Sequence, residues 1–403
     1  MDTDHSAAQS EWSILNFSMH SGKAQMPNYL TSRNRKRRVV VLHGHTSIEV
    51  FHSLTPLLRT AEATRGFIEW EFQDYTTSNI FKASGDILIL VRRYHGWRQT
   101  RIEMEAELAR LRRSFGKIIY FDDSAATSIV LFNIFDYVDE YWKRAVFKNY
   151  ENYNKDLYGG HLFSDYYHRN YGVEDGGVSS DFQRSEGVDF KKLRVAWNIG
   201  LGALPTSAPK LINQRYSTIR RVLTGLSIFS SWKLISLTLM EYFKGMERAL
   251  EADPGFDRRR NLFSSRFESE NYKPSIGYQR RLMCQIIEGD ASHLTGRVGR
   301  WDFTTETFQV RGVLSPFGWG EVCYRDFEAV LGGAVLIKPD MSHVDTWPNI
   351  FTKNSYAPIS WDLRELKSLS PEQVQEAPVL EAKGIYLEAL SGQVARVRGL
   401  LGL

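Results

Sequence analysis

Apolar runs and amphipathic segments alternate through the first half of the chain. Val39–His43 is a continuous apolar run, and apolar residues in Glu49–Ala63 after it recur with helical spacing. Asp86–Val91 and Lys117–Phe121 are further apolar runs, and the charged segment Ile102–Phe115 between them again has helical spacing. Short buried strands that alternate with helices are typical of a parallel sheet covered by helices on both faces. We therefore predict a doubly wound α/β domain in this half.

The second half of the chain repeats this pattern. A long segment with helical spacing, Ser217–Ala252, precedes a new apolar run at Asn261–Ser264. A helical stretch at Tyr278–Glu288 and an apolar run at Ala334–Ile337 follow, and Ala377–Leu400 has the spacing of a last helix. These elements predict a second α/β unit followed by a C-terminal helix. The fold class that we expect is α/β with two Rossmann-like domains.

Length and charge exclude some classes of protein. A chain of 403 residues is too long for one hydrophobic core, which favours two domains. The formal net charge of +4 is too small to indicate nucleic acid as a partner. Two cysteines without metal-binding spacing indicate a reducing compartment. No apolar run has the length of a membrane span and the N-terminus lacks a signal-peptide pattern, so we expect a cytoplasmic protein. The basic cluster Arg33–Arg38 fits either a solvated surface or peripheral contact with acidic lipids at the inner face of the membrane.

The segment from Ser315 to Lys338 carries the most chemistry. It joins a Gly-rich turn, Ser315–Glu321, to a short helix with Arg325 and Glu328 and then to an apolar strand that ends at Lys338. Free N–H groups at a helix N-terminus behind small residues suit a phosphate or another anion. Glu321 and Glu328 are close to two helical turns apart, so both would face one ligand. An anion pocket beside two carboxylates is what a nucleotide sugar requires.

By these residues the segment resembles the donor-binding motif of GT-B glycosyltransferases, in which a Pro-Phe-Gly turn, two glutamates and a Gly-x-Pro-Val-like strand follow one another. The resemblance implies that Glu328 binds the donor ribose and that Glu321 contacts the sugar or stabilises charge. The chain departs from the retaining families at Ser315, where they carry the first glutamate. The alternative is that the two acids only complement a helix N-terminus and form a solvated face.

The resemblance also implies a metal-independent donor site that needs no cofactor. In GT-B enzymes basic side chains and a helix N-terminus commonly neutralise the diphosphate. Arg266 and Lys338 follow predicted strands and would take this task, unless they form surface or interdomain ion pairs. Gly318 and Gly320 belong to the donor-binding turn. Arg325 either joins the donor site or pairs with the acid four residues before it.

The loops after the first strands are where we expect the acceptor, because ligands bind beyond the carboxyl ends of parallel strands. His45, His95 and Asp122 each follow one of the predicted strands of the first half. His45 or Asp122 would take the proton from an acceptor hydroxyl, and His95 would contact the acceptor. Asp122 begins a bare acidic pair, which makes only a weak cation site.

Residues 150–190 are rich in Tyr, Gly, Asp and His and have no clean period. A long irregular segment in a compact domain is often functional, so we predict ordered loops near the cleft. Within it, Tyr166, Tyr167 and His168 would line an acceptor sugar by stacking and hydrogen bonding, or would support a loop.

The resemblance gives each part of the chain an expected role. In chain order we expect a flexible N-terminal arm (1–32), an acceptor domain (33–200), a helical linker (201–256), a donor-binding domain (257–374) and a C-terminal helix that crosses back to the first lobe (375–403).

The hypothesis that follows is a glycosyltransferase of the hexosyltransferase type. It would move a sugar from a nucleotide-diphosphate sugar to a glycan or lipid-linked acceptor. The sequence lacks a Walker P-loop, a His-Glu-x-x-His motif and a Gly-x-Ser-x-Gly motif, which removes the enzymes marked by them. Two alternatives stay open: a two-lobed protein that binds a nucleotide sugar without catalysis, and a nucleotide-sugar hydrolase or epimerase of the same architecture.

Overall fold

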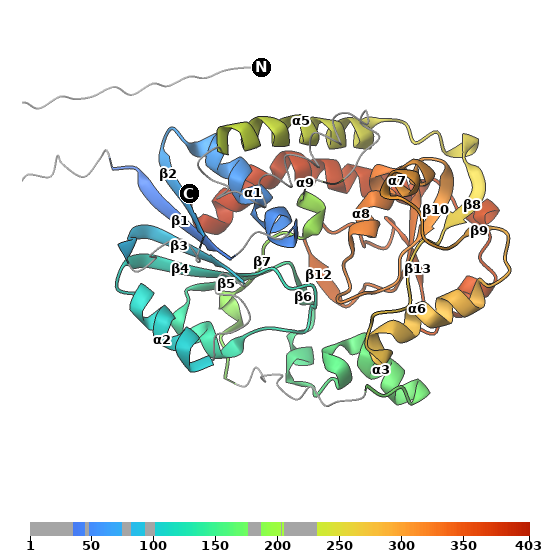
Figure 1. The fold of residues 1–403 in the computed structure, drawn as a ribbon, viewed down its shortest axis with the longest axis horizontal. Helices are drawn as coiled ribbons and strands as arrows, with labels where there is room; N and C mark the ends of the chain where they lie inside the picture. The colour runs from blue at the N-terminus through green and yellow to red at the C-terminus, as the bar shows by residue number, and fades with distance from the viewer. Residues whose placement is uncertain are drawn as a thin grey trace, which may run out of the picture. The chain divides into compact units, whose positions relative to one another are not determined.

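The first lobe is built on a six-stranded sheet with the order β2-β1-β3-β4-β5-β7. Every neighbouring pair in it is parallel (Figure 1). The computed structural model describes residues 35–44, 48–74, 82–92, 101–175, 187–202, 204 and 232–403. The strands of this sheet are β1 (Arg37–His43), β2 (Ile68–Asp74), β3 (Gly85–Val91), β4 (Phe115–Asp122), β5 (Glu140–Lys143) and β7 (Leu193–Val195).

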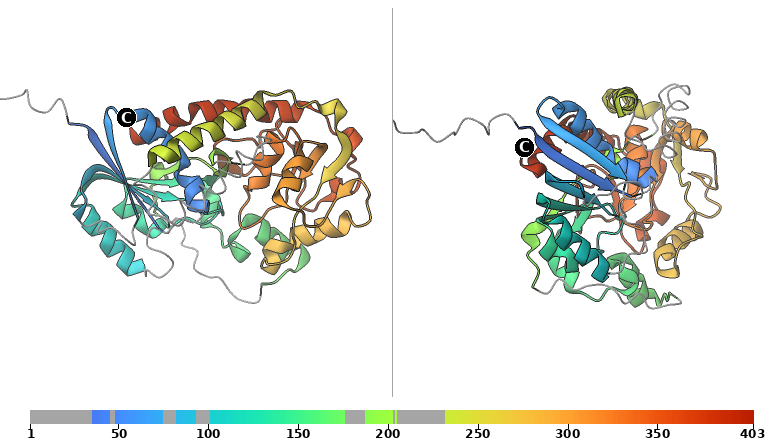
Figure 2. Two further views of the ribbon diagram at one scale, coloured as in Figure 1. Left: turned by 45° about the horizontal axis from the view of Figure 1, so that its top comes forward. Right: turned by 60° about the vertical axis from the view of Figure 1, so that its left-hand side comes forward.

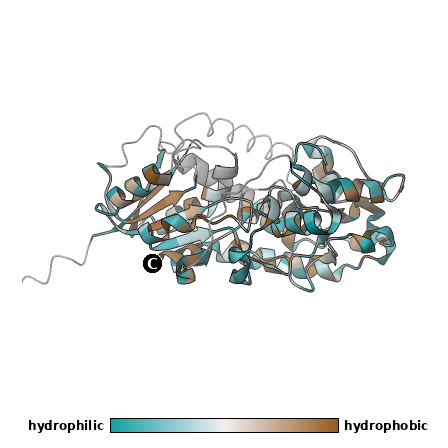
Figure 3. Cartoon of the chain, turned by 90° about the horizontal axis from the view of Figure 1, so that it is seen from below, coloured by the Kyte–Doolittle hydropathy of each residue, from teal (hydrophilic) through white to brown (hydrophobic). Residues whose placement is uncertain are grey.

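Each face of this sheet packs into its own core. Val39 and Val41 of β1 share a core with side chains of helix α1 (Ile48–Thr64). Val40, the residue between them, packs on the other face with side chains of helix α2 (Arg101–Leu111). A strand that is buried on both faces must be apolar throughout, which explains the continuous apolar runs. Figure 3 shows hydrophobic residues along the strands of this sheet.

The second lobe is built on a five-stranded sheet with the order β13-β11-β10-β8-β9, also parallel throughout. Its strands are β8 (Arg260–Ser264), β9 (His293–Leu294), β10 (Val310–Leu314), β11 (Val335–Pro339) and β13 (Ala357–Ile359). Its helices are α6 (Pro274–Ile286), α7 (Arg300–Thr307) and α8 (Tyr324–Leu331). The expected α/β class with two Rossmann-like units is therefore confirmed.

A long C-terminal helix connects the second lobe back to the first. Helix α9 (Ala377–Leu401) packs against α1 and against α5 (Trp232–Glu251), and α5 and α9 lie side by side in Figures 1 and 2. Arg59 of α1 donates a hydrogen bond to the carbonyl oxygen of Leu390 at 3.3 Å. The crossing helix predicted for this segment is confirmed.

A two-stranded antiparallel ladder ties the lobes together a second time. Strand β6 (Ala145–Phe147) of the first lobe pairs with β12 (Val344–Thr346) of the second. Because β6 follows β5 almost directly, this ladder brings the carboxyl end of β5 close to the second lobe.

The apolar runs of the sequence predict neither β2 nor β10. In β2, glutamates alternate with apolar residues, because an edge strand has one polar face, and Arg38 forms a salt bridge with Glu71 across the pair. In β10, Arg311 and Gly312 interrupt the apolar run. Gly312 is needed there because a Cβ would approach Phe263 and Ile337 to 2.9 Å.

Two further expectations differ from the structure. The segment 150–190, predicted to be loops, contains helix α3 (Leu162–Tyr171), in which three of the predicted acceptor residues lie. Of the long helix predicted at Ser217–Ala252, the described part begins at Trp232. The 3₁₀ helices among the described residues include η2 (Phe132–Tyr137), η3 (Tyr150–Asn154), η4 (Tyr158–Gly160), η5 (Phe190–Lys192), η6 (Ile199–Leu201), η8 (Phe256–Arg258), η9 (Arg364–Lys367) and η10 (Pro371–Gln373). Among the residues with described positions, no helix combines the length and the apolar character that a membrane crossing requires.

Gly320→Ala should destabilise the protein, because its new methyl group would lie 1.9 Å from the carbonyl oxygen of Ala125 in the other lobe. Overpacking of this kind costs about 1–3 kcal/mol. Gly384→Ala is the matched control, since it lies in α9 and an added Cβ meets nothing within 4 Å. It should instead stabilise by about 1 kcal/mol through helix propensity. Urea unfolding followed by circular dichroism measures both changes, and an unchanged midpoint for Gly320→Ala would contradict the close contact.

Candidate functional site

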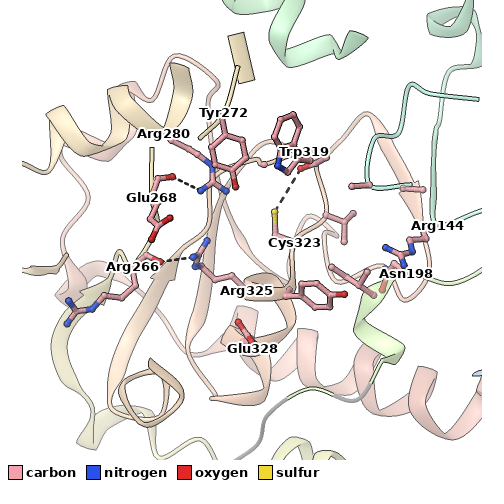
Figure 4. A pocket seen from close by; sticks show the side chains of 17 residues that line it. Arg144, Asn198, Arg266, Glu268, Tyr272, Arg280, Trp319, Cys323, Arg325 and Glu328 are labelled. Atoms are coloured by element: carbon pink, nitrogen blue, oxygen red, sulfur yellow. Dashed lines mark hydrogen bonds between the residues drawn. The ribbon is translucent and has the colours of Figure 1, made fainter. Parts of the chain in front are cut away.

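A cavity of about 510 Å³ lies where the carboxyl ends of the two sheets meet (Figure 4). Arg144 and Asn198, which follow β5 and β7, form the wall on the side of the first lobe. Arg266 and the turn Gly318–Gly320, which follow β8 and β10, belong to the opposite wall. The other lining residues are Ala125, Ala145, Ile199, Glu268, Tyr272, Arg280, Val322, Cys323, Tyr324, Arg325 and Glu328. This is the edge at which open parallel sheets bind ligands.

A second cavity of about 430 Å³ adjoins the first within the second lobe. The two share a wall made of Arg266, Glu268, Tyr324, Arg325 and Glu328. The second cavity is further lined by Phe267, Gly296, Arg297, Val298, Arg300 and Phe303. The shared wall suits an extended ligand with one end in each cavity.

Two arginines face the first cavity without a carboxylate partner. Arg280, on α6, donates to the carbonyl oxygens of Phe317 at 2.6 Å and of Glu268 at 2.8 Å. Arg325, on α8, donates to the carbonyl oxygen of Arg266 at 2.6 Å, and its buried Nε has no hydrogen-bond partner. In the part of the chain that the structure describes, neither guanidinium comes within 4.0 Å of a carboxylate oxygen. Figure 4 shows both on the same side of the cavity, an arrangement that attracts an anion.

Burial of Arg280 makes the binding of an anion at this wall more favourable. It lowers the pKa of Arg280, and the neighbouring charge of Arg325 acts in the same direction. Both effects mean that the positive charge is unfavourable here until an anion compensates it. A guanidinium still keeps its proton at neutral pH, because its ordinary pKa is so high.

Arg266 is held differently from these two arginines. It forms a salt bridge with Glu306 of α7, with 2.7 Å between Nη2 and Oε2, and it also donates to the carbonyl oxygen of Thr295. Its guanidinium points away from those of Arg280 and Arg325 in Figure 4. Arg266 lines the cavities as predicted, but its charge is already neutralised within the second lobe.

Glu328 lies in the wall shared by both cavities. Its side chain is 17% exposed, and its Oε1 lies 3.8 Å from Nη2 of Arg300. Burial raises the pKa of Glu328, against the opposing charges of Arg300 and Arg325. A partly desolvated carboxylate at the junction of two cavities can accept hydrogen bonds from ligand hydroxyl groups.

The turn Ser315–Glu321 leads into α8, and Asp326 of that helix satisfies several donors around it. The Asp326 carboxylate accepts hydrogen bonds from Ser315 Oγ at 2.6 Å and from the Cys323 amide at 2.8 Å. Lys338 Nζ lies 3.0 Å from the same carboxylate, and both side chains are fully buried. The chain therefore caps this helix N-terminus itself, and Lys338 lines neither cavity.

Glu321 does not share a helix face with Glu328, which corrects the expectation drawn from their spacing. Helix α8 begins at Tyr324, so Glu321 lies in the turn before it. Its buried carboxylate crosses to the first lobe and accepts hydrogen bonds from Thr127 N at 3.1 Å and Oγ1 at 2.8 Å. Burial acts to raise the pKa of Glu321, but His343, His161 and Thr127 together lower it to about 2. The expected pairing of Glu321 with Arg325 is likewise not formed.

Asp122 is buried at the end of β4 and lines neither cavity. Lys143 Nζ lies 3.2 Å from its Oδ2, and the Tyr141 hydroxyl donates to the same oxygen at 2.7 Å. Burial acts to raise its pKa, but the charges of Lys143 and Arg92 hold it well below the ordinary value. Asp122 therefore belongs to a buried network of ion pairs with Lys143 and Arg92. His45 and His95 lie outside the described residues.

The predicted acceptor residues of α3 lie away from both cavities. Tyr167 is buried, and its hydroxyl donates to the carbonyl oxygen of Trp361 at 2.7 Å. His168 stacks on Tyr158 with 3.8 Å between ring centroids, and Tyr166 packs edge-on against Trp361. These contacts agree with the alternative that the aromatic cluster supports a loop.

Of the residues that the sequence predicts for the donor site, the structure places Arg266, Gly318, Gly320, Arg325 and Glu328 at one cavity. The sequence patterns assign no binding role to four other lining residues, Arg144, Tyr272, Trp319 and Arg280. A signal for Arg280 exists, because it shares the buried face of α6 with Ile276 and Met283 at helical spacing. An arginine at a core-facing position of an amphipathic helix indicates a functional or ion-paired group. Across the described residues, no cluster of three or more His, Cys, Asp or Glu side chains is arranged to hold a metal ion.

Lys338→Met should destabilise the protein by about 3–5 kcal/mol, because it leaves the buried Asp326 charge without its cation. Lys353→Met is the control, since Lys353 is exposed, and it should stay within about 0.5 kcal/mol of the parent. Denaturant unfolding and nucleotide binding are measured on the same preparations. A Lys338→Met protein of normal stability that no longer binds nucleotide would restore Lys338 to the donor site.

No protein-family model and no curated protein sequence match this chain. Solved structures do align with it along most of its length. A glycosyltransferase from Rickettsia africae shares 8% identity over 91% of this chain and 97% of its own, with a TM-score of 0.43. S. aureus MnaA, solved with UDP, shares 11% over 91% and 97%, with a TM-score of 0.40. A Listeria monocytogenes protein provisionally assigned as a UDP-N-acetylglucosamine 2-epimerase shares 10% over 91% and 96%, also at 0.40. All these TM-scores lie below 0.5, so the fold class is taken from the strand order described above.

Proposed function

We propose that the protein is a glycosyltransferase that binds a nucleotide-diphosphate sugar across the two adjoining cavities and transfers the sugar to a glycan or lipid-linked acceptor. The observation that carries this proposal is the pair Arg280 and Arg325, whose guanidinium groups face the first cavity and donate to backbone carbonyl oxygens, with no carboxylate partner among the described residues. A diphosphate is an anion of the right charge and geometry for two such groups.

The position of the shared wall suggests where each part of the donor would bind. Arg325 and Glu328 line both cavities, so the diphosphate and ribose would lie there, with Glu328 accepting a ribose hydroxyl. The base would enter the second cavity, and the sugar would project into the first, towards Arg144 and Asn198 of the other lobe. This orientation presents the sugar to an acceptor that enters between the lobes.

The arginines would also serve the chemical step. As the glycosidic bond breaks, negative charge develops on the leaving diphosphate, and fixed donors that face it lower the barrier. Backbone carbonyls hold both guanidinium groups in place before the donor binds, so little reorganisation is required. His45 stays the candidate for the base that deprotonates the acceptor, on the sequence argument alone. Asp122 and Glu321 are buried in contacts of their own and fit that role less well.

Arg325→Met should weaken nucleotide binding by roughly 10- to 100-fold, because a charge-assisted contact worth about 1.5–3 kcal/mol is lost. Arg280→Met should act in the same direction. Arg281→Met is the matched control, since Arg281 is the neighbour of Arg280 on α6 and lines neither cavity. Calorimetry with UDP, GDP, CMP and dTDP and their sugar conjugates measures the affinities. Equal affinity in all three variants would remove the arginine pair from the site.

Transfer should persist in excess EDTA after dialysis, because Arg280 and Arg325 supply the positive charge that a divalent cation would otherwise bring. The measurement is product formation from the donor that calorimetry identifies, with and without acceptor. Product that forms only with acceptor supports a transferase, whereas release of free sugar or a changed sugar without acceptor would point to a hydrolase or an epimerase. Binding without any turnover would favour the non-catalytic alternative. Loss of transfer in EDTA that Mn²⁺ or Mg²⁺ restores would contradict the metal-independent mechanism.

A further inference from the structure

Trp319 presents a large aromatic surface at the first cavity. It follows Gly318 in the turn after β10, and it is 54% exposed although it is among the lining residues. Other large apolar side chains of the described residues are also exposed, including Phe67 at 53% and Trp301 at 38%, but these line neither cavity. Exposed aromatic area at a cavity that also carries polar groups is typical of a ligand-binding surface.

The indole is held in place by its neighbours. Its ring packs on the ring of Tyr272, with 5.3 Å between centroids and 37° between planes. The Arg280 guanidinium lies over the ring of Tyr272, 4.5 Å from its centroid. Arg280 is in turn fixed to the carbonyl oxygen of Phe317, two residues before Trp319. Guanidinium, phenol and indole therefore form one contiguous cluster at the cavity wall (Figure 4).

The glycines on either side of Trp319 keep this arrangement rigid. A Cβ at Gly318 would lie 3.2 Å from Arg280 Nη2, and a Cβ at Gly320 would collide with the backbone of Ala125. The turn is thus packed against Arg280 on one side and against the first lobe on the other. Its remaining side chain, Trp319, is left to face the ligand space.

We propose that Trp319, supported by Tyr272, forms the platform on which a sugar ring of the acceptor stacks, and that this platform selects a saccharide acceptor. The inference rests on the proposed transferase function and names its acceptor subsite. A pyranose ring has an apolar C–H face and a rim of hydroxyl groups. An aromatic face suits the C–H face, and the polar groups of Glu268 and Tyr272, which line the same cavity, suit the hydroxyl groups.

The position of the platform sets it apart from where the parts of the donor would lie. The nucleoside would occupy the second cavity, which neither Trp319 nor Tyr272 lines. The diphosphate would lie at Arg280 and Arg325, and the donor sugar would project from it towards Arg144 and Asn198, which Figure 4 shows apart from Trp319. Because about half of the indole remains open to solvent, a ring that stacks on it can belong to a longer glycan that extends out of the cavity.

The test compares Trp319→Ala and Trp319→Phe with the control Trp301→Ala, which removes an exposed tryptophan outside both cavities. Binding is followed by saturation-transfer NMR and tryptophan fluorescence, in the presence of the nucleotide that calorimetry identifies. The probes are cellotriose, maltotriose, chitotriose and methyl glycosides of the common hexoses, with p-nitrophenol as a non-saccharide aromatic. Trp319→Ala should weaken binding of the preferred saccharide, and raise its KM in transfer, on the order of tenfold. Trp319→Phe, which retains a ring, should restore most of this loss, and Trp301→Ala should leave both quantities unchanged.

Nucleotide affinity separates this inference from the proposed function. Trp319→Ala should change the dissociation constant of the nucleotide less than twofold. Nucleotide binding by the parent without any saccharide binding, or an equal KM in Trp319→Ala and the parent, would overturn the platform while leaving the donor site intact. Preference for p-nitrophenol over every saccharide would overturn the acceptor class. Absence of nucleotide binding in the parent would instead refute the transferase function on which the inference rests.

Discussion

The site depends on one buried carboxylate, that of Asp326. It accepts hydrogen bonds from Ser315 at the end of β10, from the Cys323 amide at the start of α8 and from Lys338 of β11. A charge without partners in the protein interior would cost several kcal/mol, so these three elements are constrained to one arrangement. The turn between Ser315 and Cys323 therefore has fixed ends.

This turn divides its residues between the two lobes. Gly320 abuts the backbone of Ala125, and Glu321 reaches Thr127, whereas Trp319 faces the cavity. The low pKa of Glu321 means that a charged acceptor bonds the first lobe at neutral pH. Together with the β6–β12 ladder, the turn holds the first-lobe wall of the cavity beside the second lobe. A cavity formed by two lobes requires such ties, because neither sheet alone encloses it.

The charge that the site offers to a ligand depends on which groups bind its arginines within the protein. A carboxylate partner both orients and neutralises a guanidinium, as Glu306 does for Arg266. A backbone carbonyl orients the group but leaves its charge available, as for Arg280 and Arg325. Burial then increases the attraction of these two groups for an anion, since water screens them less. Arginines in similar positions along the sequence thus have different roles that only their partners reveal.

The sequence by itself determined the fold class and the location of the site. Continuous apolar runs such as Val39–His43 specify strands buried on both faces, and the turn–helix–strand order from Ser315 to Lys338 predicts an α/β connection that carries polar groups. Local patterns suffice for both, because they depend on residues that are close along the chain. The assignment of β10 failed because Arg311 and Gly312 obscure its apolar pattern.

Only the tertiary structure decided which polar side chains face the cavity. Glu321 and Glu328 have equivalent positions in a helical pattern, yet the first bonds a residue 194 positions away and the second lines both cavities. Lys338 follows a strand as Arg266 does, but a buried carboxylate holds it in the core. These outcomes depend on partners that are distant in sequence, because a buried charge is stabilised by whichever group the fold brings beside it. For that reason spacing along the chain predicts where a site lies, whereas packing between the lobes determines its members.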